Sequence, residues 1–88
     1  MIKTLNNKRR SDIEISADIL KVAMNGAKKS HIVYRANLNF DVLKRYLKRL
    51  NAAGLINFPS FNGRIFKTTS KGKEYINQYE NLNAYIPR

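Results

Sequence analysis

Cysteine and tryptophan are absent from the 88-residue sequence, and histidine occurs once, as His31. Without cysteine the chain forms neither a disulfide framework nor a thiolate metal site, and one histidine leaves too few ligands for zinc. No apolar run approaches the ~20 residues of a membrane-spanning helix, and the N-terminus lacks the apolar segment of a signal peptide. We therefore expect a cytoplasmic protein without a cofactor and without a membrane partner.

Acidic residues are also scarce, because six Asp and Glu face seventeen Lys and Arg and leave a formal net charge of +11. Such an excess is typical of proteins that bind a polyanion, either nucleic acid or an anionic membrane surface. Membrane-surface binding requires Lys and Arg beside an exposed apolar face, whereas a core explains the apolar faces here. The carboxylates are scattered and no Gly-rich phosphate loop occurs. We expect no enzyme and no small-molecule ligand.

The composition indicates a single globular domain, since 43% of the residues are hydrophobic and 26% are charged. We expect residues 1–10 to form a flexible basic arm. Residues 11–88 would then form the domain, with a C-terminal helix over about 70–86.

The segment 39–53 has the clearest helical pattern, because winding it at about 100° per residue separates apolar from charged side chains. The apolar set is Phe40, Val42, Leu43, Tyr46, Leu47, Leu50 and Ala53. The charged set is Asp41, Lys44, Arg45, Lys48 and Arg49. Asn39 is the expected N-cap and Gly54 the expected left-handed residue at the end. Such a helix buries its apolar face and presents its charged face to an anionic partner.

Two shorter helices are expected before it. Ser11 and Glu14 form a capping box, and the helix that follows ends at Asn25-Gly26. Its wide apolar surface implies two neighbouring elements, or a dimer partner in addition. The segment 27–34 contains β-branched residues and is compatible with a strand, but we favour a short helix with Ser30 as its N-cap. The next residues resemble a tight turn in which Asn37 tolerates a left-handed conformation.

After Gly54 the pattern becomes extended, and the range 55–68 reads as a hairpin turning at Asn62-Gly63. Phe66 and Thr68 would face the core, with Ile65 and Lys67 outward. Thr69 is the expected N-cap of a last helix from Ser70 to about Ala84. A tight packing contact would explain the glycine at position 72.

The last helix carries apolar side chains beyond what a small core needs. We expect a helix-to-helix seam between two copies of the chain. Its members are Tyr75, Tyr79, Leu82, Tyr85 and Ile86. The alternative is a protein–protein interaction module that uses these apolar seams within a larger complex.

A helix, two helices joined by a short turn, a hairpin and a closing helix form the order of a winged helix-turn-helix domain, mainly α with a small β-hairpin wing. The sequence also resembles, over roughly residues 10 to 84, the small archaeal winged-helix DNA-binding proteins of about ten kilodaltons. The resemblance lies in Ile13–Ile19, in Lys28–Tyr34 with Ala36-Asn37-Leu38, in Leu43, Tyr46 and Leu47, in Ala53–Ile56 and in Thr69–Gly72. That family comprises chromatin-associated proteins and archaeal or archaeal-virus transcription regulators, so the protein is expected to be nucleoid-associated, in a host cytoplasm if viral.

The resemblance implies a homodimer on double-stranded DNA, with the helix 39–53 in the major groove and the hairpin as a wing on the backbone. Family dimers often use a long C-terminal coiled coil, whereas this helix has only three to four turns before the chain ends at Arg88. That length argues against a long coil and is compatible with a compact helix pair. Carried over by position, the recognition-helix residues are Asn39, Lys44, Arg45, Lys48 and Arg49, and the wing-tip residues are Asn62, Gly63 and Arg64.

The residue types themselves also suit DNA. The helix carries two rows of cations one turn apart that can neutralise successive phosphates, Lys44 with Lys48 and Arg45 with Arg49. Arg45 can instead pair with guanine, and Asn39 or Asn37 with adenine. A further candidate phosphate site is the N-terminus of the preceding helix, with Lys28, Lys29 and Ser30.

Overall fold

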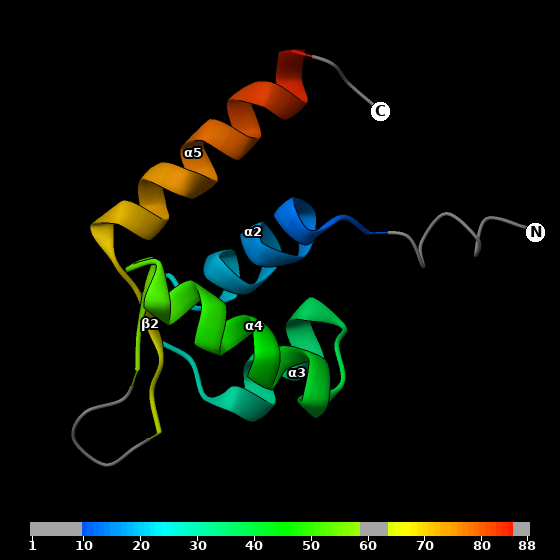
Figure 1. Ribbon diagram of the computed structural model, residues 1–88, viewed down its shortest axis with the longest axis vertical. Helices are drawn as coiled ribbons and strands as arrows, with labels where there is room; N and C mark the ends of the chain where they lie inside the picture. The colour runs from blue at the N-terminus through cyan, green and yellow to red at the C-terminus, as the bar shows by residue number, and fades with distance from the viewer. Residues whose placement is uncertain (1–9, 59–63, 86–88) are drawn as a thin grey trace, which may run out of the picture.

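The computed structural model describes residues 10–58 and 64–85, which form four helices and two short strands (Figure 1). The elements are α2 (Asp12–Val22), α3 (Lys29–Ala36), α4 (Phe40–Ala52), β1 (Ile56–Asn57), β2 (Lys67–Thr68) and α5 (Ser70–Tyr85). Helix α2 lies between α5 on one side and the α3–α4 pair on the other, and the two paired strands lie against these helices, β1 beside α4 and β2 beside α2 and α5. The predicted order of elements is confirmed.

Helix boundaries follow local capping. The Ser11 hydroxyl accepts the Glu14 N–H at 3.1 Å, and the Asn39 side chain accepts the Val42 N–H at 2.8 Å, so both predicted N-caps are confirmed. Asn37 adopts φ 56° and ψ 56° at the end of α3, as its left-handed turn required. The prediction that Ser30 is the N-cap was wrong: α3 begins two residues earlier than that cap implies, at Lys29, and Lys28 occupies the N-cap without a side-chain hydrogen bond.

The helix α2 also ends earlier than expected. Its last residue is Val22, and a turn leads to Gly26, whose φ of +97° redirects the chain toward Ala27. Ala27 then exchanges two backbone hydrogen bonds with Phe66, at 2.9 and 2.8 Å, in an isolated antiparallel bridge. The sequence pattern did not indicate this pairing.

The hairpin is confirmed, although its paired strands are shorter than the expected range. Ile56 pairs with Thr68 and Asn57 with Lys67 in antiparallel register. Phe66 and Thr68 are buried while Ile65 and Lys67 are exposed, as predicted. The expected turn at Asn62-Gly63 lies outside the described residues, as does most of the predicted basic arm 1–10, of which the structure describes Arg10 alone.

The core lies where α2, α3, α4 and the hairpin meet. Its fully buried large side chains are Ile19, Leu20, Ile32, Leu43 and Ile56. The buried Thr68 hydroxyl donates to the Leu20 carbonyl at 2.7 Å, which satisfies the polar group inside this core. Phe40, which we placed on the apolar face of its helix, is instead 54% exposed, and Ile13 on α2 is 58% exposed.

The junction between α4 and α5 is tightly bonded. Thr69 is the predicted N-cap of α5: its hydroxyl accepts the Gly72 N–H at 3.0 Å and donates to the Gly54 carbonyl at 2.7 Å. The Lys71 ammonium donates to the Ala53 carbonyl at 3.0 Å, which satisfies the C-terminus of α4. A Cβ atom at Gly72 would lie 2.2 Å from the Leu55 carbonyl oxygen. The expected tight contact at Gly72 is therefore confirmed.

Candidate nucleic-acid interface

The exposed side of α4 carries a cationic strip formed by Lys44, Arg45 and Lys48. The opposite side of the helix anchors it, because Leu43, Tyr46, Leu47 and Leu50 are buried. All three cations are exposed, and within residues 10–58 and 64–85 no carboxylate forms an ion pair with them. Their charge is therefore available to an external anion. We call these three residues the α4 strip.

Arg49 occupies a different position on the same helix. Its guanidinium lies 3.5 Å from the Asp12 carboxylate and 5.0 Å from the centre of the Tyr46 ring. The Tyr46 hydroxyl also donates to Asp12. These contacts join the first turn of α2 to α4, and they direct Arg49 toward α2, at the edge of the α4 strip.

The contacts among Asp12, Tyr46 and Arg49 shift the pKa values of two of these side chains. The hydrogen bond from Tyr46, followed by the nearby Arg49 charge, lowers the pKa of Asp12 below its ordinary value. Burial and the same hydrogen bond raise the pKa of Tyr46. Asp12 therefore remains ionised at neutral pH and holds both partners.

Of the polar residues near the α3–α4 turn that we predicted to contact DNA, one is already used in the fold. Asn39 uses its amide oxygen for the cap of α4, so a bidentate pair with adenine would compete with that cap. Asn37 is exposed beside it. At the start of α3, Lys28 and Ser30 are exposed and Lys29 is half-buried.

Of the predicted wing-tip residues, the structure describes only Arg64. Arg64 is exposed at the start of the second half of the hairpin, and Asn62 lies outside the described residues. The Phe58 ring packs edge-on against the Phe66 ring at 5.4 Å between centroids, and Phe66 is buried against the core. The described part of the hairpin is thereby held against the domain.

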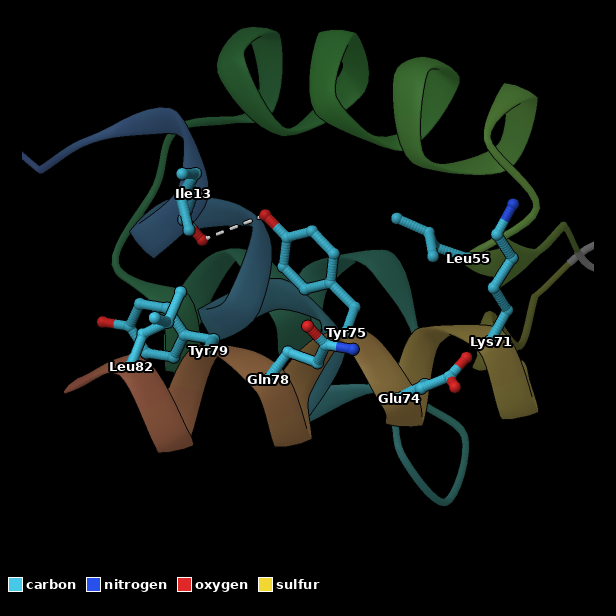
Figure 2. A pocket seen from close by; sticks show the side chains of 8 residues that line it. All are labelled: Ile13, Leu55, Lys71, Glu74, Tyr75, Gln78, Tyr79 and Leu82. Carbon is cyan, nitrogen blue, oxygen red and sulfur yellow. Dashed lines mark hydrogen bonds between the residues drawn. The ribbon is translucent and has the colours of Figure 1, made fainter. Parts of the chain in front are cut away.

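Three of the expected seam residues, Tyr75, Tyr79 and Leu82, line a groove on one side of α5. This groove of about 350 Å³ runs between α5 and the segments around Ile13 and Leu55, and Tyr75 points across it and donates to the Ile13 carbonyl at 3.4 Å (Figure 2). Tyr75 and Tyr79 are half-buried, whereas Leu82 is 67% and Tyr85 is 84% exposed. Ile86, the last predicted member, lies outside the described residues.

Sequence reasoning missed the role of Arg10, which we assigned to the basic arm. Its guanidinium pairs with Asp18 at 2.9 Å and also donates to the carbonyls of Ala36 and Asn37 at 2.9 and 3.1 Å. Arg10 thus connects α2 to the turn that precedes α4. No local signal identifies these partners, because Ala36 and Asn37 are 26 and 27 residues away.

The sequence between residues 9 and 86 matches the model of a protein family described as winged helix-turn-helix. The chain belongs to this family. The chain is also similar to the crystal structure of Sso10a-2, a DNA-binding protein from Sulfolobus solfataricus, with a TM-score of 0.80 and 30% identity. The similarity covers 86% of this chain and 81% of Sso10a-2. No curated protein sequence matches at a significant level.

These comparisons confirm the predicted winged helix-turn-helix fold and the resemblance to small archaeal winged-helix proteins. In the terms of this fold, α3 and α4 form the helix-turn-helix and the hairpin forms the wing. Within the parts of the chain that the structure describes, no helix is long and apolar enough to cross a membrane. The same parts contain no group of three or more His, Cys, Asp or Glu side chains able to hold a metal ion.

Proposed function

We propose that the protein binds double-stranded DNA with α4 in the major groove and the hairpin along the sugar–phosphate backbone. The α4 strip carries this proposal: three exposed cations lie on a helix whose other face is buried, so the helix can enter a groove without unfolding. The excess of seventeen cationic over six acidic residues provides the long-range attraction. The likeness to a DNA-binding protein supports the same assignment.

Residues outside α4 would contact the phosphates on either side of it in this orientation on the duplex. They are the cations Lys28 and Lys29 and the hydroxyl of Ser30 at the start of α3, and the cation Arg64 on the wing. Asn37 and Asn62 would add polar contacts to the backbone. Arg49 would contribute at the edge, with Asp12 holding its side chain in position.

We also propose that the DNA-binding form is a homodimer that pairs through α5. Leu82, which lines the groove in Figure 2, and Tyr85, the last residue of α5, leave large apolar areas exposed, and a second copy of α5 would cover them. A dimer presents two copies of the α4 strip to one duplex. We propose that such a dimer serves as a transcription regulator or as a chromatin-type protein.

Salt dependence of binding tests the DNA proposal. Affinity for a random-sequence duplex is measured between about 50 and 200 mM salt, where the slope of log affinity against log salt reports about 0.9 per phosphate neutralised. Lys44→Ala/Arg45→Ala/Lys48→Ala should weaken binding at every salt concentration and reduce the slope by about 2–3 per protomer.

A matched pair of single variants controls for net charge. Lys48→Ala and Lys73→Ala each remove one exposed lysine from a helix, but Lys73 lies on α5. Lys48→Ala should reduce the slope by about 1, and Lys73→Ala should leave it nearly unchanged. Equal effects of the two variants would contradict a specific role for the α4 strip, and absence of binding at low salt would favour the interaction module.

Sedimentation equilibrium tests the dimer. Leu82→Glu places a charge in the exposed apolar area and should shift the protein to monomer, whereas Asn81→Glu adds the same charge to the neighbouring exposed position of α5. A wild-type protein that is monomeric at all concentrations would refute the proposed homodimer.

A further inference from the structure

Two side chains at the start of α4, Phe40 and Asp41, are exposed. The Asp41 charge suits the N-terminal end of the helix dipole, and within residues 10–58 and 64–85 neither side chain forms a hydrogen bond, ion pair or ring contact. Leu38 and Leu43 occupy the two positions of a hydrophobic staple around the Asn39 cap: Leu38 packs against the core, in which Leu43 is fully buried. Asn39 supplies the cap. The Phe40 side chain is left 54% exposed directly beside these residues.

Asp41 is the one acidic residue of α4, and it lies on the exposed side within a turn of Lys44 and Arg45. In the described part of the chain it forms no ion pair with either of them. A free carboxylate on a surface that faces phosphates weakens binding through like-charge repulsion. This cost is avoided where the carboxylate meets a hydrogen-bond donor, and in the major groove the exocyclic amine of cytosine is such a donor.

The exposed charges of α4 differ along its length, negative in the first turn and positive in the two turns that follow. The first turn carries an aromatic ring and a carboxylate, and the next two turns carry the α4 strip. Phosphates line the walls of the groove and base edges form its floor. A helix that enters the groove with its N-terminal end foremost brings the first turn to the base edges and leaves the cations at the walls.

We infer that Phe40 and Asp41 read base identity. Phe40 contacts the methyl group of a thymine, the one apolar group on the major-groove edge, and Asp41 accepts a hydrogen bond from the amine of a cytosine. Lys44, Arg45 and Lys48 contact phosphate and bind without regard to sequence. This inference rests on the proposed function and names the residues that select the target of that site.

The test begins with the sequences that the wild-type protein enriches from a random duplex library. The preferred site should contain a thymine and a cytosine at fixed separation. Replacing thymine by uracil in the preferred duplex removes only the methyl group and should weaken wild-type binding about fourfold. The Phe40→Ala protein should bind the two duplexes equally, and its salt slope should match that of wild type.

The cytosine contact is tested at its own position. Changing that base pair to T·A replaces the amine by an oxygen acceptor and should weaken wild-type binding about 5- to 150-fold. Asp41→Ala should abolish this discrimination while raising affinity for random DNA by up to about fivefold, because one repulsive charge is gone. Glu74→Ala removes an equally exposed carboxylate from α5 and should leave the base preference intact.

The outcomes separate the two proposals. Normal DNA binding without an enriched sequence, equal wild-type affinity for the thymine and uracil duplexes, or a cytosine preference that survives Asp41→Ala would overturn the base-reading inference and leave DNA binding standing. Absence of DNA binding by the wild-type protein would overturn both. The uracil comparison uses the unmodified protein, so its result does not depend on how a variant folds.

Discussion

Gly72→Ala reverses the usual effect of alanine in a helix. Replacing glycine by alanine inside a helix ordinarily stabilises it by about 0.8–1 kcal/mol. At this position the added Cβ would lie 2.2 Å from the Leu55 carbonyl oxygen and 2.5 Å from the Thr68 methyl carbon. The first of these atoms belongs to the backbone and cannot rotate away. Overpacking costs about 1–3 kcal/mol, and a clash with a backbone atom belongs at the upper end of that range. After the helix gain of about 1 kcal/mol is subtracted, we expect a net loss of about 2 kcal/mol.

The expected loss is measured by urea unfolding and thermal melting, both followed by circular dichroism at a fixed protein concentration. For a domain of this size, 2 kcal/mol lowers Tm by roughly 8–16 °C. Asn77→Ala is the matched control, because it also introduces alanine into α5 but at an exposed position. That variant should be neutral or more stable by up to about 0.7 kcal/mol.

A second substitution tests the geometry of the contact. Thr68→Ser removes the methyl group nearest the new Cβ but keeps the hydroxyl that donates to Leu20. In the Gly72→Ala background, Thr68→Ser should recover only part of the lost stability, because the Leu55 carbonyl oxygen still clashes with the new Cβ. A Gly72→Ala protein as stable as wild type would refute the reasoning, because α5 would then pack less closely than described.

Two further predictions concern ion pairs. Asp12 has a lowered pKa, so its contribution to stability is present above the unfolded-state pKa of about 3.9 and is lost as pH falls through the lower folded-state value. Asp12→Asn should therefore flatten the fall in unfolding free energy below about pH 4, as urea titrations at several pH values would show. Arg10→Ala should cost about 1–2 kcal/mol, because its charged hydrogen bonds to Asp18 and two carbonyls are lost. Glu80→Gln, which breaks a half-exposed pair with Lys21, should cost less than about 0.5 kcal/mol; equal losses would contradict this ranking.

Much of the fold was predictable because its signals are local. Ser11, Asn39 and Thr69 form caps within three residues of their partners, and Asn37 adopts the left-handed conformation that asparagine tolerates. The strong two-sided pattern of α4 also identified its buried face and its cationic strip. These features depend on spacing along one segment, which a sequence displays directly.

The remaining features depend on contacts between distant segments. Arg10 with Asn37, and Asp12 with Tyr46, join residues 27 and 34 positions apart. The bridge between Ala27 and Phe66 likewise joins a loop to the wing. Helical spacing also assigned Phe40 to the apolar face, because periodicity alone does not show where a neighbouring element ends. The exposed position of Phe40 became evident only in three dimensions.

The bonded junction of Thr69, Lys71 and Gly72 determines the direction in which α5 leaves α4. With 16 residues, α5 is about 24 Å long. Tilting it by about 10° at the junction would displace its far end by about 4 Å, a little more than the rise of one base pair, about 3.4 Å. If two copies pair through α5, this junction sets the distance between their recognition helices. The packing at Gly72 would then determine the spacing of the DNA half-sites that the dimer fits.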